Sequence, residues 1–136
     1  MKMEYRSWEE QIPQEIKNDS LWNIKAYRLS LFLGELGWHD INRLMQDRQT
    51  STLCEQISSS LDSISANIAE GYSRSSAKEK AHFYEYSLGS ARESRDWYFK
   101  CWHVLGEAVF KHRLSLISEI IRLINHDPRP TQANFA

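Results

Sequence analysis

Apolar side chains recur every three or four positions from residue 20 to residue 125, which is the spacing of one face of an α-helix. No segment alternates apolar and polar positions as a half-buried strand does, and no Asn-Gly or Asp-Gly dipeptide signals a β-hairpin. The pattern predicts an all-α fold with four helices, over about 20–45, 52–71, 76–105 and 110–124. Because the connections are short, we expect an up-down-up-down four-helix bundle.

Short motifs mark the expected ends of these helices. Thr52-Leu-Cys-Glu55 and Ser76-Ala-Lys-Glu79 match the capping box, in which a hydroxyl and a carboxylate each bind an unpaired backbone N–H. Gly71 is expected to end the second helix in a left-handed cap, and Gly106 to stop the third. The sequence therefore places a turn between Gly71 and Ser76.

The chain has 136 residues, which is enough for one domain with one core. We expect the bundle to occupy residues 20–126, with residues 127–136 as a loose C-terminal tail. Residues 1–19 lack the long periodic pattern, but Ser7-x-x-Glu10 could cap one turn and Pro13 could begin another. We therefore predict an N-terminal extension of short helical turns packed across the bundle.

Composition and charge narrow the choice of partners and compartment. The formal net charge is −1, so no global field would attract the chain to nucleic acid or to an anionic membrane. No stretch approaches the run of about 20 apolar residues of a membrane span. Cys54 and Cys101 lack the spacing of a zinc site or a disulfide framework. We expect a cytoplasmic protein with buried thiols and with no metal or cofactor.

Small side chains gather on the second and third predicted helices. Ser59, Ser63 and Ala66 form a line beside the isoleucines of the second helix, and Gly89 and Ser90 lie in a similar run on the third. Small residues let two helices approach closely. We interpret these residues as the two halves of one close helix crossing.

Polar residues adjoin the line of small residues on the second helix. Asn67 and Glu70 are one turn apart near the helix C-terminus, where the helix dipole disfavours a carboxylate. Glu70 should therefore have a cationic partner, and the candidates are Arg74, Arg92 and Arg95. We interpret Asn67, Glu70, Arg74 and Arg92 as polar pins of the crossing; the alternative is a small polar pocket at the end of the bundle.

Together the segments SISANIAEGYSR and FYEYSLGSARES resemble the proteins of intervening sequences in bacterial 23S ribosomal RNA, a family related to the accessory variability determinant of diversity-generating retroelements. The resemblance depends on Asn67-Ile-Ala-Glu-Gly71, on Arg74 and on Ser87-Leu-Gly-Ser-Ala-Arg-Glu93, and it covers residues 21–125. It implies a four-helix bundle that forms a ring-shaped homopentamer, without enzymatic activity and with a suspected role in binding nucleic acid or a protein that handles it.

Several basic residues could form a local patch despite the acidic balance of the chain. Each has acidic neighbours in the sequence, so the simplest interpretation is a solvated surface of mixed charge that binds no partner. In a ring, each weak patch would be repeated around the axis and would form a cationic rim. The candidates for binding nucleic acid or a protein partner are Arg74, Lys78, Lys80, Lys111 and Arg113.

The third predicted helix carries aromatic residues on more than one side, and a single bundle core cannot contain them all. We therefore expect subunit contacts rather than base stacking, and hence a homo-oligomer. The residues are Phe83, Tyr84, Tyr86, Trp97, Tyr98, Phe99 and Trp102.

Catalysis has little support in the sequence. Glu79-x-x-His82 has the spacing of the ligands in di-iron bundles, but such sites need a second copy of the motif, and none exists here. The first hypothesis is therefore a non-enzymatic, oligomeric scaffold that presents a surface to a macromolecular partner. The alternative is a nucleic-acid or ribonucleoprotein binder that uses a repeated basic rim.

Overall fold

The computed structural model of the protein describes residues 3–126 and confirms the all-α prediction, because no strand occurs in that range. The four long helices are α3 (Lys25–Leu44), α4 (Cys54–Tyr72), α5 (Ala77–Lys100) and α7 (Glu107–His126). The shorter elements are α1 (Tyr5–Glu10), α2 (Gln14–Lys17), the 3-10 helices η1 (Ser20–Asn23) and η2 (Ser51–Leu53), and α6 (Trp102–Leu105). The expected tail, 127–136, lies outside the described residues.

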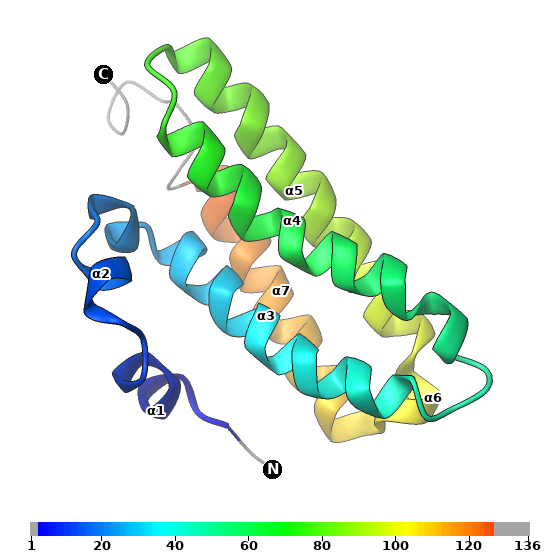
Figure 1. Ribbon diagram of the computed structural model, residues 1–136. Helices are drawn as coiled ribbons and strands as arrows, with labels where there is room; N and C mark the ends of the chain where they lie inside the picture. The colour runs from blue at the N-terminus through cyan, green and yellow to red at the C-terminus, as the bar shows by residue number, and fades with distance from the viewer. Residues whose placement is uncertain (1–2, 127–136) are drawn as a thin grey trace.

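The four long helices form a closed bundle in which each helix packs against two others (Figure 1). Helix α3 contacts α4 and α7, and α5 contacts the same two helices from the other side. Helices α4 and α5 are antiparallel, since Ser60 meets Ser94 whereas Ile64 meets Ser87. Short connections between neighbours give the up-down-up-down order that the periodicity predicts.

The core consists of the apolar stripes of these four helices. Each stripe repeats every three or four residues, so its side chains share one face and point into the bundle. Burying one such side chain contributes about 1.5–3 kcal/mol to folding. The largest fully buried side chains are Leu33, Leu44, Ile57, Ile64, Ile68, Tyr84, Tyr98, Leu105, Ile117, Ile120 and Ile124.

One of the two expected capping boxes forms a cap. The Ser76 hydroxyl accepts a hydrogen bond from the Glu79 backbone N–H over 3.1 Å, so α5 begins as predicted. The prediction for Thr52 is wrong, because Thr52 lies in η2 and α4 begins at Cys54 without a side-chain cap. The preceding Thr50 is instead buried, and its hydroxyl donates to the Leu44 carbonyl over 2.6 Å.

Gly71 does not end α4 in a left-handed cap, which corrects the prediction. It lies inside the helix, and a Cβ built there would be 2.7 Å from Cε1 of Tyr84 on α5. Gly71 therefore permits a close approach of the two helices. Gly106 has the only positive φ among the described residues, 87°, and it ends α6. The expected third helix is broken before that point, at Cys101.

The N-terminal extension lies beside α3, on the side of the bundle away from α5 (Figure 1). Trp8 on α1 is buried against Phe32 and Leu36 of α3, and it forms with them a second apolar cluster separate from the main core. The ring centroids of Trp8 and Phe32 are 5.3 Å apart. Ser7 is not a cap, because α1 begins at Tyr5.

Candidate functional site

Serine side chains line the contact between α4 and α5. The Ser63 hydroxyl donates to the Ser90 hydroxyl over 2.7 Å, and the Ser94 hydroxyl donates to that of Ser60 over 3.1 Å. The buried Ser87 hydroxyl donates to the Ile64 carbonyl over 2.7 Å. Small polar residues thus join these two helices by hydrogen bonds as well as by packing.

Not all of the residues expected in this crossing lie in it. Ser63 and Ser90 meet, but Ser59, Ala66 and Gly89 are exposed, and nothing would lie within 4 Å of a Cβ at Gly89. The line of contact is displaced around α4 by about one residue, because the buried isoleucines fix which face of the helix points inward.

The expected polar pins are local contacts on the surface. The Asn67 side-chain amide donates to the Ser63 carbonyl of its own helix over 2.8 Å. Glu70 pairs with Arg74 over 3.0 Å, with side chains that are 56% and 41% exposed, respectively. The Arg74 guanidinium also lies over the Phe83 ring, 4.7 Å from its centroid. Arg92 is exposed and, by the register of α4 and α5, roughly 13 Å along the bundle from Glu70.

The five basic candidates do not form one patch. Lys78 is exposed in the first turn of α5, and Lys80 donates to the Tyr72 carbonyl over 3.0 Å. Lys111 pairs with Glu107 over 2.8 Å; this pairing raises the pKa of Lys111 and lowers the pKa of Glu107. Arg113 corrects the prediction outright, because it is buried rather than exposed on a rim.

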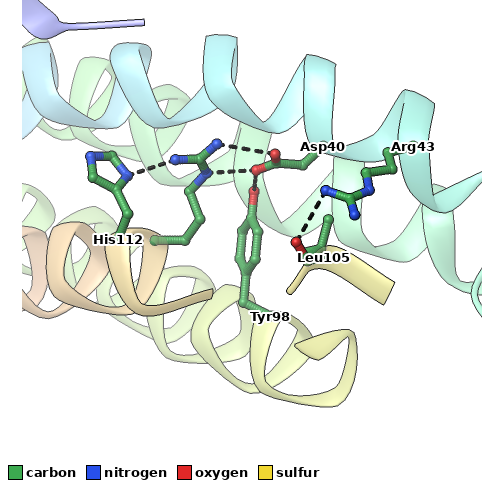
Figure 2. A network of polar contacts seen from close by, with 6 residues as sticks. Asp40, Arg43, Tyr98, Leu105 and His112 are labelled. Atoms are coloured by element: carbon green, nitrogen blue, oxygen red, sulfur yellow. Dashed lines mark hydrogen bonds and ion pairs between the residues drawn. The ribbon is translucent and has the colours of Figure 1, made fainter. Parts of the chain in front are cut away.

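Arg113 belongs to a buried polar network between α3, α5 and α7, near the end of the bundle that holds α6 (Figure 2). Its Nε donates to Oδ2 of Asp40 over 2.7 Å, and its Nη2 donates to Oδ1 over 3.1 Å. The Tyr98 hydroxyl donates to the same Oδ2 over 2.7 Å. The network therefore joins α3, α5 and α7. Near it, Arg43 of α3 donates to the Leu105 carbonyl of α6 over 3.1 Å.

The electrostatics of this network follow from burial and pairing. Burial lowers the pKa of Arg113, but the hydrogen bond and charge of Asp40 outweigh that effect, so the pKa is raised overall. Burial, with the charge of Asp40, holds the pKa of Tyr98 well above its usual value. Arg113 therefore stays protonated, and Tyr98 stays a hydrogen-bond donor. Removing one partner of such a buried pair strongly destabilises the folded protein, because the other charge is left buried and unpaired.

Sequence reasoning missed this network, although a signal for it exists. Asp40 continues the apolar stripe of Leu33, Leu36 and Leu44, and Arg113 continues the stripe of α7 before Ile117. A charged residue at a core position of a helix needs an opposite charge nearby, since an unpaired charge is costly to bury. An Asp at a core position of one helix and an Arg at a core position of another therefore predict a buried ion pair between the two helices.

Large apolar side chains are exposed at several places on the bundle. We define the aromatic patch as Phe99, Trp102, His103 and Phe110, at the junction of α5, α6 and α7. Phe99 is 58% exposed, and the Trp102 ring stacks on those of Phe110 and His103 at centroid distances of 5.6 and 5.3 Å. Trp38 of α3, 69% exposed, borders a pocket of about 300 Å³ between α3 and α4.

Residues 3–126 lack two kinds of feature. No three His, Cys, Asp or Glu side chains in that range are grouped so that they could hold a metal ion. None of the helices there combines the length and the apolar character that a membrane span requires.

A family model described as 23S rRNA-intervening sequence protein matches residues 23–126, the range that holds all four long helices. The chain belongs to this family. The match to the 23S rRNA-intervening sequence protein family confirms the resemblance seen in the segments around Asn67 and Ser87. Helices α1 and α2 lie outside the matched range. Comparisons with curated proteins and with solved structures gave no match.

Proposed function

We propose that the protein is a non-enzymatic scaffold that assembles with copies of itself and presents a shared surface to a macromolecular partner. The observation that carries this proposal is the aromatic patch. Phe99 and Trp102 are exposed in the single chain, at 58% and 41%. Contiguous apolar surface of this kind typically marks an interaction site. The resemblance to the family implies a ring-shaped homopentamer as the form of the assembly.

The remaining polar groups fit a scaffold better than an enzyme. Asp40, Tyr98 and Arg113 are engaged with one another inside the bundle, where the Asp40 carboxylate accepts from both partners. The Glu70–Arg74 and Glu107–Lys111 pairs are exposed. We also propose a reducing, cytoplasmic location, which the buried free thiols of Cys54 and Cys101 support.

Light scattering coupled to size-exclusion chromatography tests the assembly. We expect a single oligomeric species for the unaltered chain and a monomer for Trp102→Glu, because a carboxylate in the aromatic patch would be desolvated on assembly. Ile16→Glu is the matched control, since Ile16 is 40% exposed but lies on α2. A monodisperse monomer for the unaltered chain would refute the proposal.

Nucleic-acid binding is the second candidate function. It is supported by the exposed Lys78, by Lys80 next to it in the first turns of α5, and by the family description, which names 23S rRNA. Phosphate contacts make affinity fall steeply with salt. We expect such binding, measured with RNA at low salt, to weaken in Lys78→Ala/Lys80→Ala and to persist in Lys17→Ala. No binding of RNA or DNA at low salt would exclude this candidate.

A further inference from the structure

A pocket of about 490 Å³ lies between the N-terminal extension and the α3–α7 side of the bundle. Its volume is in the usual range for small-molecule sites. Most of its wall is apolar, and its polar groups are contributed by Glu4, His112 and Arg113. The apolar wall consists of Met3, Tyr5, Phe32, Leu36, Ala108 and Val109. The oligomeric scaffold proposed above makes no use of this pocket.

Arg113 gives the pocket a fixed hydrogen-bond donor. Its Nε and Nη2 each donate to Asp40, and its Nη1 donates to Nδ1 of His112 over 2.6 Å. A guanidinium has five N–H groups, two of them on each terminal nitrogen. Nη1 and Nη2 each use one N–H in these hydrogen bonds, and the Tyr98 hydroxyl is a further hydrogen-bond partner of Arg113. The second N–H groups of Nη1 and Nη2 can therefore donate to a further acceptor while Asp40 and His112 hold the guanidinium in place.

The charge around the pocket decides which acceptor fits. The bidentate Asp40 carboxylate already balances the charge of Arg113. Nδ1 of His112 accepts from Arg113, because a guanidinium can only donate. Glu4, which is exposed, adds a negative charge to the lining. Among the described residues, Arg113, Asp40 and Glu4 together carry a net negative charge, which would repel an anionic ligand but not a neutral carbonyl compound.

We propose that this pocket binds a small neutral molecule with an apolar body and a carbonyl oxygen, and that the carbonyl accepts from Nη1 and Nη2 of Arg113. Asp40 is then a positioning residue, because it aims the guanidinium and cancels its charge. A buried ion pair adds little stability compared with apolar residues of the same volume. Orienting a donor toward a ligand gives the pair a use beyond stability.

Nile red, a neutral carbonyl-containing dye that fluoresces in apolar surroundings, is a suitable probe for the full-length chain. We expect saturable binding of one dye per chain. Ala108→Trp fills the pocket and should weaken binding by about tenfold or more, whereas Ala66→Trp should stay within about twofold of the unaltered chain. Both alanines are exposed helical positions, so the pair controls for folding and for added aromatic surface.

Anilinonaphthalene sulfonate, an anionic dye of similar apolar character, tests the charge argument. It should bind more weakly than Nile red, and Glu4→Gln should raise its affinity about threefold without changing that of Nile red. Circular dichroism melting would show that each variant is folded. The proposal is overturned if Nile red does not saturate, if Ala108→Trp and Ala66→Trp bind it equally, or if the sulfonate binds more tightly to the unaltered chain.

Discussion

Two arginine–carboxylate pairs occupy contrasting places in this bundle. Glu70 and Arg74 are four residues apart at the end of α4, and both side chains are about half exposed. Asp40 and Arg113 are separated by 73 residues, and they are 6% and 9% exposed. The first pair conforms to a local sequence pattern. The second joins helices that are far apart in the chain.

The contrast shows that the ion pair recognisable from sequence spacing, Glu70 with Arg74, is the weaker of the two. An exposed pair is screened by water and salt and contributes about 0–1 kcal/mol. A buried pair is screened much less, and removing one partner leaves an uncompensated charge. The Glu70–Arg74 pair should therefore contribute little to the free energy of unfolding. Loss of one partner of the Asp40–Arg113 pair should lower that free energy most.

The largest expected effect is that of Asp40→Ala. The variant leaves Arg113 charged and buried without a partner, so we expect a loss of about 3–5 kcal/mol in the free energy of unfolding, measured by urea denaturation. The double variant Asp40→Leu/Arg113→Met should recover most of that loss, because it removes both charges together. A loss below about 1 kcal/mol for the single variant would contradict the burial of the pair.

Next in size is the effect of Gly71→Ala, one residue beyond Glu70. The added Cβ would overlap the Tyr84 ring on α5, and overpacking of this kind costs about 1–3 kcal/mol. Gly89→Ala is the matched control: its Cβ meets nothing within 4 Å, so it should stabilise the helix by about 0.5–1 kcal/mol. Equal effects of the two substitutions in thermal melting would contradict the close approach of α4 and α5.

Tyr98→Phe should cost about 1–2 kcal/mol, because Asp40 loses one of its hydrogen bonds. The pKa of Tyr98 is raised in the folded chain, so its contribution is complete below about pH 10, the usual pKa of the unfolded chain. Above that pH the unfolded chain releases the proton first, and stability falls. Tyr98→Phe should therefore lessen the alkaline loss of stability by up to about 1.4 kcal/mol per pH unit. Identical alkaline slopes in the two proteins would contradict this account.

The smallest expected effect is that of Glu70→Gln. We expect a change below about 0.5 kcal/mol at low salt, and none at 1 M salt, because the Glu70–Arg74 pair is exposed. Urea titrations at two salt concentrations would measure it. A salt-independent loss above about 2 kcal/mol would show that the pair is not a surface contact.

The helical pattern predicted the fold well because each long helix carries its own apolar period. It also predicted the Ser76 cap, which involves residues three positions apart. It failed for Gly71, where the controlling contact comes from Tyr84 on another helix. Sequence spacing reports contacts within one helix, and it cannot show which residue of a second helix lies opposite.

In the candidate site, too, contacts between near neighbours in the sequence could be predicted, whereas contacts between helices could not. The possible pairing of Glu70 with Arg74 was foreseen, since Arg74 lies one turn after it. Arg113 was grouped with its exposed neighbour Lys111, because both are basic and near the start of α7. Only the bundle geometry turns one of them inward toward Asp40. The pocket beside Arg113 also depends on the N-terminal extension, which the sequence predicts to pack across the bundle without showing which helices it contacts.

Double-mutant cycles on the two pairs test the central claim most directly. The coupling free energies of Asp40 with Arg113 and of Glu70 with Arg74 would come from urea denaturation of the single and double alanine variants. The account predicts coupling above about 2 kcal/mol for the buried pair and below about 0.5 kcal/mol for the exposed pair. Equal coupling energies, or a larger value for Glu70 with Arg74, would contradict it.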